Sequence, residues 1–178
     1  ITVACYTNCP EVQLSLNGHD LGTKRIAEAV EGVLTWTVPY EPGTLKAIGL
    51  RDGKNVSEFA LQTAGPAARV ELLPDVTQLA ADDNAIAHVE YRIVDAKGIR
   101  VPDAASAVTF ELTGPAQIIG LGNGDLSNSE DPRGHVHRAY QGRGLAILQS
   151  TTAPGPITLK ASAPDLQPAV VTLQSVQA

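Results

Sequence analysis

The residues whose side chains could bind or catalyse gather between positions 118 and 137. An apolar run, 118–121, passes into Gly122-Asn123-Gly124-Asp125, and a loop rich in Asn, Ser, Asp and Glu follows. His135 and His137 come directly after this loop. Such a composition suits a phosphate cradle, a metal site, a cluster of catalytic carboxylates or a contact surface. Which of these it is decides whether the chain is an enzyme or part of one.

Glycines 120, 122 and 124 resemble a dinucleotide-binding fingerprint, but that fingerprint must open a helix directly after a strand. Here the following residues run into Glu130-Asp131-Pro132, which is a poor helix core. Nucleotide binding is therefore disfavoured, and no cofactor is expected. The simpler interpretation is that the glycines permit positive φ at a strand end. Asn123 and Asp125 would then hydrogen-bond the loop onto itself.

Metal binding is the next alternative for this loop. Asp125, Glu130 and Asp131 carry hard oxygen donors, but they lack the strict alternation of a calcium-binding EF-hand, so only an irregular calcium site stays open. His135 and His137 are two residues apart and would project from the same face of a strand. No third ligand is visible beside them. The spacing therefore predicts an exposed histidine pair on an edge strand rather than a transition-metal site.

The sequence shows no arrangement of residues that is typical of a catalytic site. Glycoside hydrolysis needs two carboxylates held around a sugar-sized cleft, and no two acids are paired by spacing. Serine nucleophiles on a strand-to-helix elbow need Gly-x-Ser-x-Gly, which does not occur. Trp36, near Tyr40, could stack on a sugar, although a sole tryptophan is more typical of a sandwich core. The candidates for contact with a partner or a glycan are Asn123, Asp125, Glu130, His135, His137 and Trp36.

Cys5 and Cys9 have a C-x3-C spacing. Zinc sites usually show four ligands in paired short spacings, and no such set is present. A disulfide would close a very small loop, so ordinary thiols are favoured and a bridge remains the alternative.

The elements that must position these residues are strands, because apolar residues alternate with polar ones almost throughout. Val12, Leu14 and Leu16 alternate and are followed by Asn17-Gly18, a hairpin turn signal. Only 24–30 could form a helix, and at seven residues a strand edge or loop is at least as compatible. Short strands with regular turn signals predict an all-β protein.

The residues 62–68 combine small side chains with Gly65-Pro66 and suggest a domain boundary. Beyond them the alternation resumes, and 145–148 is apolar on both faces, as in a central strand. We therefore predict two tandem immunoglobulin-like β-sandwich domains, 1–63 and 64–178.

Charge and hydropathy exclude two classes of partner. The formal net charge is −6 and no Lys/Arg cluster exceeds two neighbours, which argues against nucleic-acid binding. No apolar run reaches the roughly 18–20 residues that a membrane-spanning helix needs, so membrane insertion is not expected. The sequence begins mid-pattern without a signal peptide, so we expect an excised fragment whose compartment stays open.

Two sets of segments carry a family resemblance. CYTNCPEVQLSLNGHDLGTK and LTWTVPYEPGTLKAIGLRDGK resemble a small β-sandwich module that follows the catalytic barrel of bacterial glycoside hydrolase family 2 enzymes. ADDNAIAHVEYRIVDAKGIRVPDA, VTFELTGPAQIIGLGNGDLSNSE and GRGLAILQST resemble that family's terminal immunoglobulin-like domain. The resemblance covers the whole chain in the correct order.

The resemblance implies a non-catalytic, C-terminal accessory part of a retaining β-galactosidase or related exo-glycosidase. Its partners would be the catalytic (β/α)8 barrel and other domains of the same chain. The family's catalytic glutamates lie in that barrel, so none is carried over. A periplasmic or secreted location is expected for the parent. A carbohydrate-binding module and an immunoglobulin-like spacer of a surface adhesin are the alternatives.

The resemblance also concerns the start of the first module. In the family a strand, often containing Trp, precedes the Tyr6-Thr7-Asn8-Cys9 segment. Ile1 starts too late for most of that strand, so the module is expected to be short of it. Cys9 matches the motif's cysteine, and Cys5 does not, which weakens the case for a disulfide.

Overall fold

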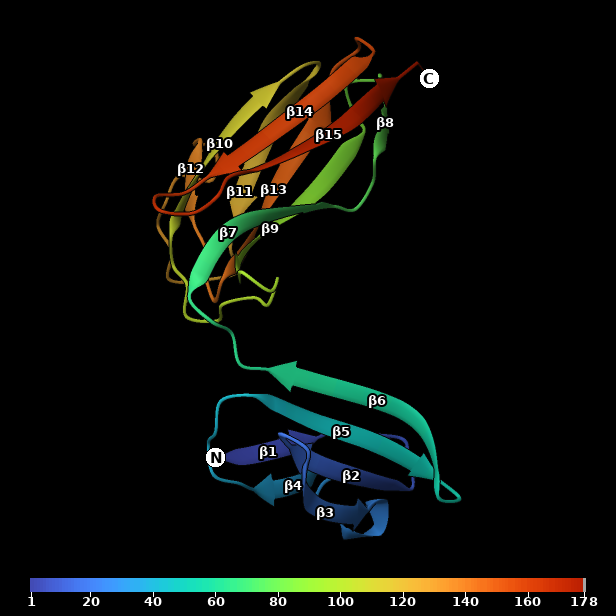
Figure 1. Ribbon diagram of the computed structural model, residues 1–178. Coiled ribbons are helices and arrows are strands. Elements are labelled where there is room, and N and C mark those ends of the chain that lie inside the picture. The colour runs from blue at the N-terminus through green and yellow to red at the C-terminus, as the bar shows by residue number, and fades with distance from the viewer. Residues whose placement is uncertain (178) are drawn as a thin grey trace. The chain divides into compact units, whose positions relative to one another are not determined.

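The computed structural model describes residues 1–177 and is all-β, with one short 3-10 turn among its strands (Figure 1). The chain divides into two compact units, Ile1–Thr63 and Ala64–Ala178, and the division falls within the small-residue stretch 62–68. None of the described residues belongs to a helix long and apolar enough to cross a membrane. The predicted all-β class with two sandwiches is confirmed.

The first unit packs a two-stranded sheet against a four-stranded sheet. The small sheet pairs β1 (Thr2–Cys5) with β4 (Leu34–Thr37), antiparallel. The larger sheet has the order β3-β2-β5-β6, where β2 is Glu11–Leu16, β3 is His19–Arg25, β5 is Thr44–Arg51 and β6 is Lys54–Gln62. The buried core consists of Val12, Leu14, Leu34, Trp36 and Val38. These residues recur every second position, which places them on the inner faces of the two sheets.

Two short turns set the register of the larger sheet. Asn17 and Gly18 have φ of 51° and 83°, and Asp52 and Gly53 have 51° and 70°. Positive φ at both central residues is the hairpin turn whose twist matches that of the flanking strands. The turn predicted at Asn17-Gly18 is confirmed, and Asp52-Gly53 forms a turn of the same kind between β5 and β6.

The segment 24–30 contains no α-helix. β3 continues through Arg25, and a single 3-10 turn, Ile26–Glu28, follows it. The Glu28 carboxylate accepts the backbone N–H of Arg25 at 3.0 Å and fastens this turn to the strand end. Of the two alternatives for this segment, the strand edge with a loop is therefore the one observed.

The start of the first unit carries a strand and two free thiols. Thr2–Cys5 forms β1, so the chain does supply a strand ahead of Tyr6. Cys5 and Cys9 are both free, which makes the disulfide alternative wrong. Cys9 is buried, and its Sγ lies 3.5 Å from Ser57 Oγ.

The second unit is a larger sandwich of five strands on four. One sheet has the order β12-β10-β14-β15-β8, with β8 (Gln78–Ala80), β10 (Ala107–Thr113), β12 (Val136–Arg138), β14 (Gly155–Ser162) and β15 (Ala169–Val176). The other has the order β11-β13-β9-β7, with β7 (Ala67–Pro74), β9 (Ile86–Asp95), β11 (Ala116–Gly122) and β13 (Arg143–Ser150). One continuous apolar core lies between the two sheets.

The position of the Tyr91 ring at the centre of that core accounts for the glycine at position 144. Tyr91 is completely buried and meets Phe110 edge to face, with ring centroids 5.1 Å apart. Gly144, on the neighbouring strand β13, lies directly against the Tyr91 ring, and a Cβ there would collide with it. The central strand β13 thus carries a glycine so that the tyrosine ring can lie across it. This ring position brings the Tyr91 hydroxyl to the 123–138 region.

Candidate functional site

The residues 123–135 form a loop that leaves β11 and returns as β12, and we call it the 123–135 loop. Gly124 has φ of 81°, which is the left-handed conformation that glycine adopts without steric cost. Asn123 Oδ1 accepts the backbone N–H of Asp125 at 2.9 Å, and Asp125 Oδ1 accepts that of Ser127 at 2.9 Å. The prediction that Asn123 and Asp125 hydrogen-bond the loop onto itself is confirmed.

Asp125 serves as an internal acceptor. The Ser127 hydroxyl also donates to Asp125 Oδ1 at 2.7 Å, and the bonds from Ser127 lower the pKa of the Asp125 carboxyl. A carboxylate that already accepts these bonds holds its own turn in place. It is therefore a structural residue of the loop.

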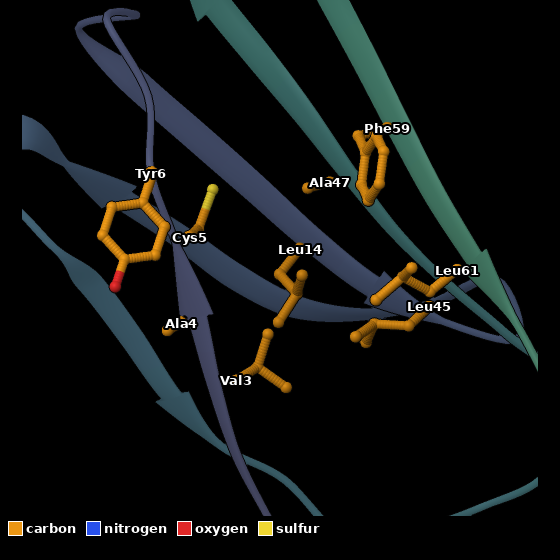
Figure 2. Close-up of a pocket in the computed structure, with 9 residues that line it drawn as sticks. All are labelled: Val3, Ala4, Cys5, Tyr6, Leu14, Leu45, Ala47, Phe59 and Leu61. Carbon is orange, nitrogen blue, oxygen red and sulfur yellow. The ribbon is translucent and has the colours of Figure 1, made fainter. Parts of the chain in front are cut away.

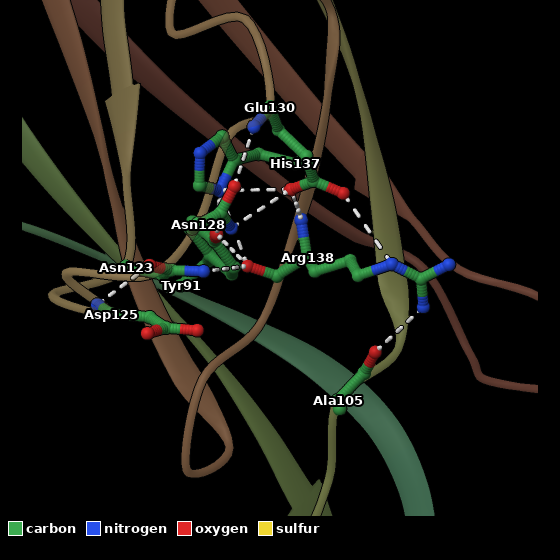
Figure 3. Close-up of polar contacts among 8 residues, drawn as sticks. All are labelled: Tyr91, Ala105, Asn123, Asp125, Asn128, Glu130, His137 and Arg138. Atoms are coloured by element: carbon green, nitrogen blue, oxygen red, sulfur yellow. Dashed lines mark hydrogen bonds and ion pairs between the residues drawn. The ribbon is translucent and has the colours of Figure 1, made fainter.

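Glu130 connects the loop to strand β12. Its Oε2 accepts the backbone N–H of Arg138 at 2.8 Å and the amide of Asn128 at 3.2 Å. Its Oε1 lies 3.4 Å from the Arg138 guanidinium (Figure 3). The Arg138 backbone bond is the main reason why the pKa of Glu130 is lowered. Asn128, His137 and the Arg138 charge add to this effect, and partial burial opposes it.

The two histidines do not form an exposed pair, so that prediction is wrong. His137 lies on β12, and its side chain is 4% exposed, whereas His135 precedes the strand and is exposed. Because His135 is outside the regular strand, the two-residue period no longer applies to the pair. The backbone of His135 still contributes, since its carbonyl accepts the N–H of Phe110 at 2.8 Å.

His137 belongs to a buried polar cluster. Its Nδ1 lies 3.2 Å from the carbonyl oxygen of Arg138 and 3.4 Å from the Tyr91 hydroxyl, which itself donates to that carbonyl at 3.0 Å (Figure 3). A carbonyl oxygen only accepts, so the contact with Arg138 is a hydrogen bond in the tautomer of His137 that carries its proton on Nδ1. Glu130 Oε2 is 3.7 Å from the same nitrogen. These contacts join His137 to Tyr91, Glu130 and Arg138 within the second unit.

Trp36, the remaining candidate, lies in the core of the first unit and is 5% exposed. A platform for sugar stacking needs an open aromatic face, so the suggestion that Trp36 contacts a glycan is wrong. Lys24 Nζ covers the ring at 5.4 Å from its centroid. Trp36 therefore performs the alternative role, as a core residue of the sandwich.

A metal centre is not assembled by these residues. Among residues 1–177, no group of three or more His, Cys, Asp and Glu side chains is placed to hold a metal ion. Asp125 and Glu130 are each committed to donors of the loop, as described above. In the described part of the chain, the acidic residues considered for an irregular calcium site therefore do not form a set of metal ligands.

The loop does present one residue that sequence reasoning missed. Leu126 is fully exposed, although the backbone N–H groups on either side of it, those of Asp125 and Ser127, are held by side chains of the loop. An apolar side chain held outward on an ordered loop is a typical anchor for a protein contact. The signal in the sequence was a single leucine within a polar loop, and this pattern alone does not distinguish an anchor from a buried residue.

Two known domain families match the chain, one in each of its two units. A model of glycoside hydrolase family 2 C-terminal domain 5 matches residues 70–172, and that of a domain of unknown function (DUF4982) matches residues 1–57. A β-galactosidase of Bacteroides ovatus is 34% identical over 98% of this chain and 21% of its own length. A β-glucuronidase of Formosa agariphila is 28% identical over 98% of this chain and 18% of its own length.

Solved structures give the same result. A family 2 glycosyl hydrolase from Bacteroides cellulosilyticus superposes with a TM-score of 0.93 at 32% identity, covering 99% of this chain and 23% of that protein. A β-glycosidase from Bacteroides vulgatus has a TM-score of 0.92 at 29% identity and covers 98% and 22%. The chain thus spans about a fifth of the length of the proteins that it matches.

Proposed function

The chain belongs to glycoside hydrolase family 2, in the C-terminal region of such enzymes, and on that premise we propose that it is a non-catalytic accessory part of a larger glycosidase. The observation that carries the proposal is the match of nearly the whole chain to about a fifth of each relative. The buried polar cluster and the self-bonded carboxylates of the 123–135 loop fit a structural role.

The first test is an activity assay of the 178-residue chain. With 4-nitrophenyl β-galactoside as substrate we expect no turnover above a blank, because the resemblance implies that the family's two catalytic glutamates lie in a barrel outside these residues. Robust hydrolysis by the purified chain would overturn the proposal.

The parent enzyme is proposed to be a retaining β-galactosidase that cleaves terminal β-galactosides in a (β/α)8 barrel outside these residues. Two similar proteins, from Bacteroides ovatus and Thermoanaerobacter pseudethanolicus, are β-galactosidases at 34% and 30% identity. A β-glucuronidase is the second candidate, because the Formosa agariphila protein also matches over 98% of the chain. Assay of the full-length parent on 4-nitrophenyl β-galactoside and 4-nitrophenyl β-glucuronide separates the two activities.

The 123–135 loop is proposed to contact the catalytic barrel or another domain of the same parent, with Leu126 as its anchor. Leu126→Ser in the full-length parent should then lower the midpoint of thermal inactivation by several degrees. Val170→Ser is the matched control, because Val170 is also exposed and lies on β15, away from the loop. Equal effects of the two substitutions would argue against this contact.

The other two functions have less support. A carbohydrate-binding module loses its tryptophan platform, since Trp36 is buried. Calorimetry of the chain with galactans should give no heat of binding, and a saturable heat would favour the module. An adhesin spacer would be shown by an upstream reading frame without a barrel. A periplasmic or secreted parent is proposed from the family resemblance alone, and cell fractionation tests it.

A further inference from the structure

The first unit has an apolar hollow of about 350 Å³, which Figure 2 shows with its lining side chains. Phe59 and Leu61 of β6 belong to this lining and are 67% and 56% exposed. The only side-chain heteroatoms of the lining are the hydroxyl of Tyr6 and the thiol of Cys5. A polar ligand needs several fixed donors and acceptors, which this hollow does not offer. The second unit carries such groups on the outer face of its four-stranded sheet.

Four side chains form a row across that outer face. Glu71 of β7 lies opposite Arg92 of β9, and Arg92 lies opposite Arg143 of β13. Arg143 in turn pairs with Tyr140, across the turn that leads into β13. Residues directly opposite each other on antiparallel strands share a face, and the neighbouring position, Tyr91, points into the core. The row therefore lies on the outer face and spans about 14 Å, which is three strand spacings.

Two neighbours in this row carry the same charge. Like charges directly opposite each other destabilise a sheet, so Arg92 and Arg143 both need an anion beside them. Arg92 has one, because its Nε and Nη2 donate to the two carboxylate oxygens of Glu90 at 2.8 and 2.7 Å. Glu71 lies 3.8 Å from the Arg69 guanidinium. Arg143 is exposed, and its guanidinium forms no hydrogen bond or ion pair with any other of the residues 1–177.

The surroundings of Arg143 are positive, although the net charge of the chain is −6. The pKa of the Glu90 carboxyl is lowered mainly by the Arg92 hydrogen bonds, and the charges of Arg143 and Arg100 add to this effect, while partial burial opposes it. Arg100 lies against the same turn, since a Cβ on Gly142 would meet its Cγ at 3.3 Å. Three guanidinium groups therefore lie around Glu90, and this positive charge attracts an incoming anion.

The turn that carries Tyr140 and Arg143 is held by several backbone hydrogen bonds. These two residues bond to each other at 2.9 and 3.2 Å, and Gln141 and Gly142 between them have φ of 52° and 71°. The Gly142 carbonyl also accepts the N–H of Ile93 at 2.9 Å. Tyr140 is 41% exposed, so the turn fixes an open aromatic ring beside a free guanidinium. Groups that are fixed before a ligand arrives lose little conformational entropy on binding.

The sheet beside this turn has no side chain at Gly122. Gly122 of β11 pairs with Leu145 of β13, which is the next outward position after Arg143. Gly122 and Tyr140 lie along the same side of β13, because β9 occupies the other side. A Cβ at Gly122 would meet nothing within 4 Å beyond its chain neighbours. A flat ring can therefore lie on the backbone at this position, next to Tyr140 and Arg143.

We propose that Tyr140, Arg143 and the uncovered backbone at Gly122 form a binding site for a glycan that contains uronic acid. The carboxylate of the sugar accepts two N–H groups of Arg143, in the way that Glu90 accepts those of Arg92. The Tyr140 ring packs against the apolar face of the same sugar. This site adds a binding role to the structural role proposed above, and it does not depend on which glycosidic bond the parent enzyme cleaves.

The combination of groups favours a sugar over an acidic peptide. A uronic acid carries an apolar ring face and a carboxylate on one rigid ring, which matches an aromatic ring and a guanidinium fixed side by side. A peptide that adds to a sheet needs a free strand edge, whereas β13 has β11 and β9 on its two sides. A neutral galactan lacks the carboxylate, so the absence of heat expected for galactans agrees with this site.

Calorimetry of the 178-residue chain with tri-galacturonic acid tests the site. We expect saturable binding that Arg143→Gln weakens at least about tenfold, the usual effect of losing a hydrogen bond to a charged group. Tyr140→Ala should weaken it about three- to tenfold, the range of one aromatic contact. Arg51→Gln and Tyr40→Ala are the matched controls, because both residues are exposed in the first unit, and they should bind like the unmodified chain.

Two further ligands and a spectrum identify what the site recognises. The fully methyl-esterified trimer and hexaglutamate should both bind at least about tenfold more weakly than tri-galacturonic acid, because the first lacks the carboxylates and the second lacks the sugar ring. In an NMR titration with tri-galacturonic acid, the Nε–H signal of Arg143 and the amide of Gly122 should shift, and the Nε–H signal of Arg51 should not.

Four results would each overturn the proposal. They are no binding of tri-galacturonic acid to the unmodified chain, unchanged binding by Arg143→Gln, equal binding of the methyl ester, and equal binding of hexaglutamate. The last result would show that the surface recognises acidic protein segments by charge alone. None of these measurements depends on turnover, so the activity of the parent enzyme does not affect their outcome.

Discussion

A single oxygen, the backbone carbonyl of Arg138, receives polar groups from three parts of the second unit. The Tyr91 hydroxyl donates from β9 at 3.0 Å, the Asn123 amide from the 123–135 loop at 3.1 Å, and His137 Nδ1 lies at 3.2 Å. A carbonyl has two lone pairs, so three donors share one acceptor. This oxygen fastens the loop to the sandwich beneath it.

Tyr91→Phe removes one of these donors without changing the shape of the core. We expect the free energy of unfolding of the second unit to fall by about 1 kcal/mol, the usual net value of one hydrogen bond. Urea denaturation measures the change. Tyr40→Phe is the control, because Tyr40 is 65% exposed, and it should have an effect within about 0.5 kcal/mol. A similar loss in both variants would contradict a specific role for the Tyr91 hydroxyl.

Glu130 makes the stability of the second unit depend on pH, and the lowered pKa of its carboxyl gives the direction of that dependence. Its pKa in the folded state lies below the unfolded value, mainly because the backbone N–H of Arg138 donates to it. Its contribution to stability is therefore present above the unfolded pKa, which is about 4.3, and is lost as the pH falls through the folded pKa.

The corresponding variant is Glu130→Gln. Between pH 6 and pH 3, the unmodified chain should lose more stability than this variant, as measured by urea unfolding of both at the two pH values. Identical pH dependence in the two proteins would show that Glu130 does not carry this effect.

At the scale of the elements, the register of β13 against β9 decides where Tyr91 points. Gly144 pairs with Tyr91 across the two strands, and the ring occupies the space where a side chain at 144 would lie. The strand pair thus requires a glycine at a position where glycine otherwise weakens a strand.

Gly144→Ala should destabilise the second unit by about 1–3 kcal/mol, because the added Cβ displaces the buried ring. Gly122→Ala is a matched control on β11, since a Cβ at this position would meet nothing within 4 Å beyond its chain neighbours, and its φ is not in the left-handed region. Chemical denaturation of both variants makes the comparison. If Gly144→Ala leaves the stability of the second unit unchanged, the Tyr91 ring can move aside for the added Cβ at no cost.

At the scale of the whole molecule, each unit has its own buried core. The core of the first unit is small, with five buried residues, and an open hollow adjoins it. The second unit has a larger continuous core, which lies between sheets of five and four strands. We therefore expect the two cores to respond separately to substitution.

Leu14→Ala and Leu159→Ala remove a fully buried leucine from the first and the second core, respectively. Each should lower the stability of its own unit by about 2–5 kcal/mol. Scanning calorimetry should show two transitions, of which each variant shifts one. If both variants shift the same transition, the two units unfold together.

The sequence by itself determined the class of the fold and the places where the chain turns. The alternation of Val12, Leu14 and Leu16 and the pairs Asn17-Gly18 and Asp52-Gly53 are local signals, because side-chain period and positive φ are properties of a few neighbouring residues. The self-bonded loop at Asn123 and Asp125 was predictable for the same reason. Its hydrogen bonds join residues two apart.

Only the tertiary structure decided which side chains are buried and which are free to meet a partner. His137 is enclosed because Tyr91, 46 residues away, reaches it across the sandwich, while His135 lies beyond the strand end. Trp36 is covered, whereas Phe59 and Leu61 are uncovered because a two-stranded sheet lies on a four-stranded one. Such burial depends on contacts between segments distant in sequence and on the widths of the two sheets, which no local pattern records.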